Sequence, residues 1–529
     1  MSGQQILDGH SLSVAHLQNM AFLRDPVGEI EIPKESLQRV ERSRSALLKF
    51  LEMRVPIYGV TTGFGDSGNR TVSPHQSEQL QENLVAYLLC GTGPVLAPEV
   101  ARAILTVRLN SMCRGLSGVS VELIERMKMY LQNDWLPVIP REGSLGASGD
   151  LIPLAYLAQV IQGQGEVYCE GKIRKVTELL SERGVEPYKL KAKEGLALVN
   201  GTSAMAGLFA VNLNHARYLL DLLCMNTAWL TLALQGRTEA FGTLVNEKAK
   251  ESRGQRWVAK QVRTLLEEEN YRSIPLGQIN IAGRRTQDWV QDRYSLRCVP
   301  QIAGPIYETL QLLDGWLQEE INSASDNPLI GTDPRSADEL ANGGNFYGGY
   351  LSQGMDYLKI SLAHIADTVD RQVAYIIDDK SNRGLPTNLV SKHLPDDERN
   401  LHHGLKGLHQ SVSAMTSEIL QRSVPGGIFS RSAESHNQDK VSLGMSAAVQ
   451  CSEMIEPLFT TMTMHSAILA QALDLRGVHL TGSQSRAQYE RVRRHFPFIE
   501  KDQPMGAFIG NLREALKDQS AKRRDLGTK

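Results

Sequence analysis

The residues that could do chemistry in this chain are a tyrosine among glycines, a run of three very small residues, and a tyrosine close to an arginine. The first is the loop Tyr58-Gly-Val-Thr-Thr-Gly-Phe-Gly65. It lacks the Lys-Ser/Thr pair of a phosphate-binding loop, and no strand-then-helix pattern supports a dinucleotide site. Alone, this loop is equally typical of a turn with a packed tyrosine.

The three small residues are Ala147-Ser148-Gly149, and two interpretations of them are open. In the first, Ser148 caps the helix that follows and Asp150 favours its positive end. In the second, the backbone folds back on itself, because the side chains are tiny and glycine leaves its amide nitrogen unhindered. Attack of the Gly149 nitrogen on the carbonyl of residue 147, with loss of two waters, would make Ser148 the exocyclic carbon of an electrophilic ring. Sequence spacing does not decide between the two.

Tyr294 and Arg297 are three residues apart, so on a helical turn they share a face. A guanidinium can grip a carboxylate through two parallel hydrogen bonds, and a phenol beside it can transfer a proton. The alternative is an exposed arginine and a core tyrosine.

Four further segments place an amide side chain at a loop or helix end, where such side chains ordinarily form caps and turns: 198–203, 325–328, 343–346 and 436–439. Together with the loops they indicate an active site.

Helical periodicity dominates the chain and positions these loops. We predict a mainly α fold, in which a long-helix central bundle joins an N-terminal helical region whose loops carry active-site residues. Minor β structure is expected as a hairpin at 165–175 and as a short strand pair before the first helix. Helices are predicted at 33–53 (with Ser36 as a cap), 77–89, 98–113, 121–133, 204–234 (a buried helix pair), 302–323, 349–377, 403–422 and 441–475. We divide the chain into 1–200 with the electrophile-forming loop, 201–475 with the bundle, and a C-terminal helical tail at 476–529.

Composition excludes several classes of function. The 57 Lys and Arg residues balance 59 Asp and Glu residues, so a formal charge of −2 draws the whole protein neither to nucleic acid nor to an anionic membrane. Six cysteines without a CxxC pair, and a start without a basic and apolar signal region, indicate a reduced, cytoplasmic protein. The most apolar uncharged stretch, 457–473, is too short and polar for the about 20 residues of a membrane helix. His402, His403 and His409 lack the spacing of metal ligands.

In combination, the motifs from YGVTTGFG at 58–65 to SHNQDKVSLG at 435–444 resemble those of the histidine and aromatic amino-acid ammonia-lyase and aminomutase family. The resemblance covers most of the chain. It implies that Ala147, Ser148 and Gly149 cyclise autocatalytically to a 4-methylidene-imidazol-5-one electrophile. It also implies that the enzyme needs no metal or nucleotide.

The resemblance further implies a homotetramer whose active sites are built from three subunits. Tyr58 would be the base that removes the β-proton of a substrate held by Arg297 of another chain. Asn200 and Tyr294 would help to position the amine and the electrophile. Asn327 would bind the substrate carboxylate together with Arg297.

The same resemblance bears on the substrate. Members that act on histidine place a His and a Glu where this chain has Leu88 and Gln438, and a leucine cannot hydrogen-bond imidazole, so histidine is disfavoured. Tyr87 departs from both the His of tyrosine-selective members and the apolar or aromatic residue of phenylalanine-selective ones, and its hydroxyl could reach a ring oxygen. We therefore expect an L-phenylalanine-type or ring-substituted aryl-alanine, with L-tyrosine left open. Phe346 would pack at the ring end of the electrophile.

The expected reaction is elimination of ammonia to the trans-arylacrylate, because 62–65 with Asn69-Arg70 resembles the lyase pattern. An aromatic 2,3-aminomutase, which returns ammonia to the β-carbon, uses the same groups and stays an alternative. A histidine ammonia-lyase and a non-catalytic helical scaffold are further alternatives. Because a tyrosine with an ordinary pKa of about 10 is mostly protonated at neutral pH, we expect the field of the electrophile and the helix-end dipoles to lower the pKa of Tyr58.

Overall fold

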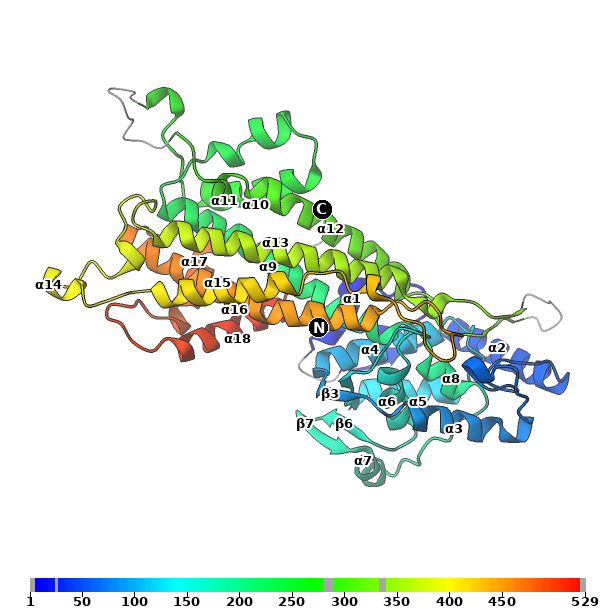
Figure 1. Cartoon of the computed structure of the whole chain (residues 1–529). Coiled ribbons are helices and arrows are strands. Elements are labelled where there is room, and N and C mark those ends of the chain that lie inside the picture. The colour runs from blue at the N-terminus through cyan, green and yellow to red at the C-terminus, as the bar shows by residue number, and fades with distance from the viewer. Residues whose placement is uncertain (1–4, 24–26, 280–289, 333–338, 524–529) are drawn as a thin grey trace.

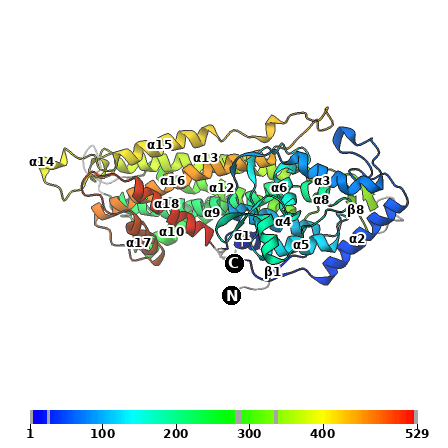
Figure 2. The ribbon, with the colours of Figure 1, turned by 90° about the horizontal axis from the view of Figure 1, so that it is seen from below.

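The structure is a computed structural model that describes residues 5–23, 27–279, 290–332 and 339–523. Long helices lie side by side in one elongated half of the molecule, and shorter helices with small sheets form the other half (Figure 1). The two halves remain distinct after a quarter turn (Figure 2). The mainly α fold predicted from the periodicity is confirmed.

The elongated half is a bundle around the helix α9 (Ser203–Ala233). Because α9 is apolar on almost every face, it is buried along its whole length and packs against helices on several sides. These neighbours are α4 (Pro98–Met112), α10 (Arg253–Glu268), α12 (Val299–Glu320), α13 (Gly349–Ile377) and α16 (Gly444–Arg476). The stretch predicted as a buried helix pair is therefore one continuous helix of 31 residues.

The remaining helices surround this bundle or extend its ends. Those of the other half are α1 (Val14–Ala21), α2 (Lys34–Glu52), α3 (Ser77–Leu88), α5 (Val121–Gln132), α6 (Leu151–Ile161), α7 (Val176–Arg183) and α8 (Glu194–Val199). Elsewhere lie α11 (Tyr294–Arg297), α14 (Asp396–Arg399), α15 (Lys406–Gln421), α17 (Ser483–His495) and α18 (Gly506–Ala521). Predicted helices end within a few residues of the observed ones. Ser36, however, does not cap α2, because its hydroxyl donates to the carbonyl of Asp8.

The strands of the described residues form four small sheets. One pair is parallel and joins β1 (Gln5–Ile6) to β2 (Ile30–Glu31). Three pairs are antiparallel: β3 (Thr92–Val95) with β5 (Pro140–Glu142), β4 (Leu136–Pro137) with β6 (Glu166–Cys169), and β8 (Leu329–Ile330) with β9 (Leu340–Ala341). The hairpin expected at 165–175 is confirmed as β6 with β7 (Lys172–Lys175).

One hydrophobic cluster runs through both halves, from Leu7 to Leu516. The division of the chain at residues 200 and 475 stays a prediction. No described helix combines the length and the apolar character needed to cross a bilayer. Over the same described ranges, no three His, Cys, Asp or Glu side chains converge as a metal site would require. The six cysteines, all of them described, are unpaired.

Helices α4 and α9 approach each other closely where Gly207 of α9 faces Ile104 of α4. A Cβ built on Gly207 would lie 2.7 Å from the backbone nitrogen of Ile104, which is closer than packed atoms tolerate. The crossing brings Arg108, one turn further along α4, to Ser203 at the start of α9. The spacing of these two helices therefore depends on a residue without a side chain.

Gly207→Ala should destabilise the fold, because α4 would have to move away from α9, and overpacking of this kind costs about 1–3 kcal/mol. Gly315→Ala is the matched control. Gly315 lies inside α12, and no described atom lies within 4 Å of the place its Cβ would take, so alanine should stabilise the helix by about 0.5–1 kcal/mol. Denaturant unfolding of both variants measures the difference. Equal stabilities would show that α4 and α9 are not in tight contact.

Candidate active site

The loop that precedes α6 is held on both sides through glycines. Gly146 and Gly149 both have φ of +70°, a left-handed conformation that favours glycine. On one side, the backbone N–H of Ser442 donates to the carbonyl of Gly146 at 3.2 Å. On the other side, Gly149 forms a parallel β-bridge with Gly201, and a Cβ on Gly149 would overlap the Gly201 backbone. The loop therefore has little freedom to move.

Asn200 holds the small tripeptide through its side chain. Its Nδ2 donates to the carbonyl oxygen of Ser148 at 2.8 Å. The N–H of Asp150 donates to the carbonyl of Gly201, also at 2.8 Å. The Oδ1 of Asn200 is buried and has no partner among the described residues. Because an unpaired buried oxygen is costly, it marks a place where a bound molecule could donate a hydrogen bond.

Asp150 does not cap its own helix. α6 begins at Leu151, and the Asp150 side chain makes no capping bond there. Its carboxylate accepts instead from the N–H of Met205, in the first turn of α9, at 2.7 Å, and from the Ser144 hydroxyl at 3.1 Å. Burial raises the pKa of Asp150 to about 7, although both of these bonds oppose the shift. The interpretation of Ser148 as the cap of α6 is therefore wrong, because no described side chain caps this helix.

Tyr58 lies at the start of a loop that α3 and α8 support. Gln81 of α3 is fully buried, and its Nε2 donates to the carbonyl of Gly59 while its Oε1 accepts from the N–H of Leu196 in α8, both at 2.8 Å. The Tyr58 hydroxyl oxygen accepts a hydrogen bond from the N–H of Gly65 at 2.6 Å. One side chain thus ties the tyrosine loop to two helices.

The pKa of Tyr58 is raised, not lowered. Burial is the largest cause, the Glu434 carboxylate adds to it, and the hydrogen bond from Gly65 opposes it. Burial and an anion thus outweigh one amide among the groups of this chain, and a lowering of this pKa by the field of the electrophile stays a prediction. Burial, followed by Glu434 and Tyr58, also raises the pKa of Tyr87 to about 12.

Tyr58 and Ser148 line one cavity of about 450 Å³, a size typical of small-ligand sites. The structure brings most of the predicted residues to this cavity: Tyr58, Tyr87, Ala147, Ser148, Asn200, Asn327, Phe346 and Gln438. Gly149 follows directly behind Ser148 in the loop. Asn327 is held by a hydrogen bond from the N–H of Gly343 to its Oδ1 at 2.7 Å. Segments far apart in the chain therefore converge on one pocket.

Leu88 does not line the cavity. It is only 6% exposed and belongs to the hydrophobic core, whereas Leu84, one turn earlier on α3, lines the cavity wall. The two leucines share a helix face because they are four residues apart. The apolar character expected at this wall is therefore supplied by a different residue.

Tyr294 and Arg297 lie far from this cavity in the same chain. On α11, the Arg297 guanidinium lies 4.6 Å from the centre of the Tyr294 ring, and Tyr294 is 70% exposed. The neighbouring Ser295 carbonyl accepts from Gln372, near the far end of α13. Phe346 lies just before α13 begins, so the length of this helix separates the two places by about 40 Å. Figure 1 shows α11 at the end of the bundle away from α3 and α8.

The cavity also holds residues that the sequence did not indicate. Leu84 and Leu196 form part of an apolar wall, while Glu434 and Lys440 bring charges of opposite sign. Leu84 could have been predicted as a wall residue, because it lies one helical turn before Leu88 on the same face. No spacing rule could have found Glu434, because it reaches the cavity from a run of three left-handed residues, 434–436.

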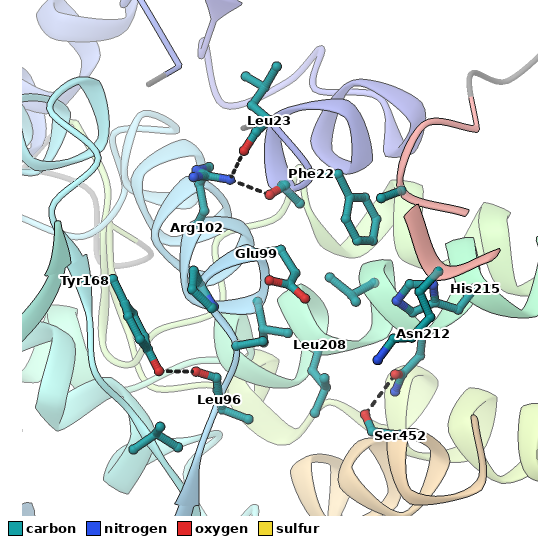
Figure 3. A pocket seen from close by; sticks show the side chains of 18 of the residues that line it. Phe22, Leu23, Leu96, Glu99, Arg102, Tyr168, Leu208, Asn212, His215 and Ser452 are labelled. Carbon is teal, nitrogen blue, oxygen red and sulfur yellow. Dashed lines mark hydrogen bonds between the residues drawn. The ribbon is translucent and has the colours of Figure 1, made fainter. Parts of the chain in front are cut away.

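A larger cavity, of about 710 Å³, lies between α1, α4, β6 and α9. Figure 3 shows Arg102 donating to the carbonyl of Leu23, and Tyr168 donating to the carbonyl of Leu96. None of the predicted site residues, all of which are described, lines this cavity. Size alone therefore does not mark the active site.

The residues present fit the electrophile that the resemblance implies. The backbone of Gly149 is packed where no Cβ could be accommodated, which suits a residue whose nitrogen has to approach the preceding carbonyl. Beside it lies the unpaired Oδ1 of Asn200. Ala147, Ser148 and Gly149 would supply the atoms of the group, and Asn200 would hold it.

Comparison with known proteins agrees with this geometry. The family described as aromatic amino acid lyase matches residues 12–494. The chain is 34% identical to tyrosine 2,3-aminomutase of Myxococcus sp. (strain Mx-B0), over 92% of this chain and 93% of that protein. It is 32% identical to histidine ammonia-lyase of Halalkalibacterium halodurans, over 98% and 97%. The solved structure of tyrosine aminomutase from Streptomyces globisporus matches with a TM-score of 0.91 at 31% identity, and 100% of each chain is covered.

The fold and the site thus define an enzyme of the ammonia-lyase or aminomutase kind. The chain belongs to the aromatic amino acid lyase family. Its relatives are named for different substrates, among them tyrosine, histidine and phenylalanine, and for two reactions, those of an ammonia-lyase and of an aminomutase. Family membership alone therefore leaves the substrate and the product open.

The raised pKa of Asp150 should make stability depend on pH. Between about pH 4 and pH 7 the folded chain keeps a proton that the unfolded carboxyl has lost, so the free energy of unfolding falls as pH rises, by at most about 1.4 kcal/mol per pH unit. Asp150→Asn keeps an acceptor for Met205 but cannot titrate. In denaturant unfolding between about pH 4 and pH 7, the free energy of unfolding of this variant should fall less steeply with pH, by about 1.4 kcal/mol per pH unit at most. Identical slopes in the two proteins would contradict the raised pKa.

Proposed function

We propose that this protein eliminates ammonia from an L-aryl-alanine, L-phenylalanine or a ring-substituted analogue, to give the trans-arylacrylate. The proposal is carried by one observation: Tyr58 and Ser148 line the same small cavity, with Asn200 bonded to the Ser148 carbonyl. A base and the predicted electrophile precursor therefore face one bound molecule. The group formed from residues 147–149 supplies an electrophilic carbon that makes the substrate amine a better leaving group.

The chain's own residues do the binding and the proton transfer. Tyr58 takes the β-proton as the phenolate, which is its minor form at neutral pH because its pKa is raised, and the Gly65 N–H that donates to its oxygen stabilises that charge. Asn327 binds the substrate carboxylate through Nδ2, because its Oδ1 already accepts from Gly343. The two residues thus act on opposite parts of the amino acid.

The cavity wall favours an aryl side chain. Leu84, Leu196 and Phe346 offer no hydrogen bond to imidazole, so this part of the wall favours an apolar ring. Tyr87 stays protonated at neutral pH, because its pKa is about 12, so its hydroxyl can donate to a ring oxygen. L-Tyrosine therefore belongs to the substrate class that we propose.

We further infer that copies of this chain form a homotetramer with shared active sites. Arg297 lies about 40 Å from the cavity of its own chain, and its Nε has no partner among the described residues. Exposed apolar side chains on α12 and α13 offer a surface through which copies could pack: Leu312, Tyr350, Tyr357 and Ile360. Tyr58 would then act on a substrate whose carboxylate is bound by Arg297 of another copy.

A second candidate function is that of an aromatic 2,3-aminomutase. It is favoured by the likeness of this chain to tyrosine aminomutases in both sequence and structure. In both reactions Tyr58 would remove the β-proton of the substrate. The difference is whether the arylacrylate leaves before ammonia adds again at the β-carbon, which depends on how long the site stays closed.

Incubation with L-phenylalanine, L-tyrosine and L-histidine separates these functions. Arylacrylate is followed by its absorbance, and β-amino acids are separated by chromatography. Free arylacrylate as the main product supports the lyase, and β-aryl-alanine as the main product supports the aminomutase. Turnover of L-histidine without turnover of either aryl-alanine would overturn the proposed substrate class.

Tyr58→Phe should lower turnover by about 100-fold or more, because a positioned general base contributes at least that factor. The absorbance of the electrophile should remain, since the tripeptide is untouched. Tyr168→Phe is a suitable control, because its hydroxyl donates to Leu96 beside the other cavity, and it should keep its activity. Substantial turnover by Tyr58→Phe would remove this residue from the role of base.

Tyr58→Phe and Arg297→Gln should complement each other if sites are shared. Each variant alone lacks one necessary group at every site. In co-expressed mixed tetramers, about a quarter of the sites would draw one intact residue from each kind of chain, so activity should return to about that fraction. Native mass spectrometry verifies the mixing. Mixed tetramers without activity would contradict a site shared between these two residues.

A further inference from the structure

A fully buried cation lies directly behind the tripeptide loop. Arg108 of α4 is 0% exposed. Its Nη2 donates to the carbonyls of Ala197 and of Asn200, the latter at 2.8 Å, and its Nη1 lies 3.5 Å from the hydroxyls of Ser203 and Ser325. Burial lowers the pKa of Arg108 to about 10, so the group is still charged at neutral pH. Burying a charge is costly, so these contacts have to be well placed.

The partners of Arg108 belong to one turn. Ala197 lies in the last turn of α8, where carbonyls without helical partners favour a cation. Asn200 and Gly201 form the turn between α8 and α9. The space that a Cβ on Gly201 would need is filled by Nη1 of Arg108. The guanidinium therefore supports the turn both by hydrogen bonds and by contact.

This turn holds the tripeptide at both ends of Gly149. On the N-terminal side of Gly149, the Ser148 carbonyl accepts a hydrogen bond from Nδ2 of Asn200. On its C-terminal side, the N–H of Asp150 donates to the Gly201 carbonyl. Both anchors come from the two residues that Arg108 supports. A displaced turn would therefore move both anchors together.

We propose that Arg108 is a positioning residue that holds the Asn200–Gly201 turn so that Ala147-Ser148-Gly149 can cyclise. In this step the Gly149 nitrogen bonds to the Ala147 carbonyl carbon. The carbonyl oxygen leaves as water with the amide hydrogens of Gly149 and Ser148, so a double bond forms between that carbon and the Ser148 nitrogen. The Ser148 hydroxyl and the Ser148 α-hydrogen leave together as a second water. This loss forms the exocyclic double bond, and no oxidant is needed. The inference rests on the proposed function, because that function requires this electrophile.

Arg108→Gln is the direct test, read by the mass of the peptide that contains residues 147–149. The wild-type peptide should be lighter than its sequence by two waters. In Arg108→Gln, cyclisation should slow by about tenfold or more, the factor carried by one lost charge-assisted hydrogen bond. The unreacted peptide should then accumulate in freshly made protein. Arg108→Lys, which can still donate to one carbonyl, should lie between the two.

Arg102→Gln is the matched control. Arg102 lies on the same helix, is 4% exposed, and also donates to backbone carbonyls, but to those of Ala21 and Leu23 beside the larger cavity (Figure 3). Its guanidinium also pairs with the Asp134 carboxylate. It should lower the melting temperature yet leave the tripeptide fully cyclised. A general loss of stability would act on both variants alike, so the peptide mass separates positioning from folding.

The outcomes distinguish this inference from the proposed function. If the wild-type peptide has lost no water, the proposed function itself fails. If the wild-type peptide has lost two waters and folded Arg108→Gln or Arg108→Lys cyclises at the wild-type rate, the role of Arg108 is refuted. If Arg108→Gln does not fold, Arg108→Lys decides: slower cyclisation than in Arg102→Gln at a similar melting temperature supports the role, and equal cyclisation overturns it.

Discussion

The candidate site depends on two glycines whose backbones touch. Gly149 and Gly201 pair as a parallel β-bridge, and a Cβ on either would overlap its neighbours, the Gly201 backbone in one case and Arg108 in the other. This contact joins the loop before α6 to the turn before α9. The tripeptide is thereby fixed at the N-terminus of α9, a buried helix that cannot shift without disturbing the bundle.

Around this contact, buried charged side chains hold the ends of helices where water would otherwise do so. Arg108 binds the last turn of α8, and Asp150 accepts from the first turn of α9. Behind them, Lys193 and Asp326 form an ion pair of 2.7 Å with almost no exposure. Such buried pairs add little net stability, but removing one partner is costly, so they keep the loops in a single arrangement. A rigid arrangement is what a reaction between a phenol and a small bound amino acid requires.

The long helices could be predicted because the 3.6-residue period of apolar side chains is a local property. The stretch 204–234, predicted as a helix pair, contains the polar residues Asn212 and Asn214. In the structure both are buried within one helix, because Nδ2 of Asn212 donates to the carbonyl of Ala448 and Nδ2 of Asn214 to that of Ser520, each at 2.8 Å. Partners from α16 and α18 satisfy these amides, and no local pattern reveals such partners.

The sequence by itself determined the residue types at the candidate site, such as Tyr58 and the tripeptide around Ser148, because the chemistry of a phenol or of three adjacent small residues is carried within a few positions. Only the tertiary structure decided that Leu84 rather than Leu88 lines the cavity, that burial together with Glu434 raises the pKa of Tyr58, and that α11 lies at the other end of the bundle. These features depend on which distant segments meet, on burial and on the length of α13. Such quantities arise from packing between elements and have no signature in the spacing of residues along the chain.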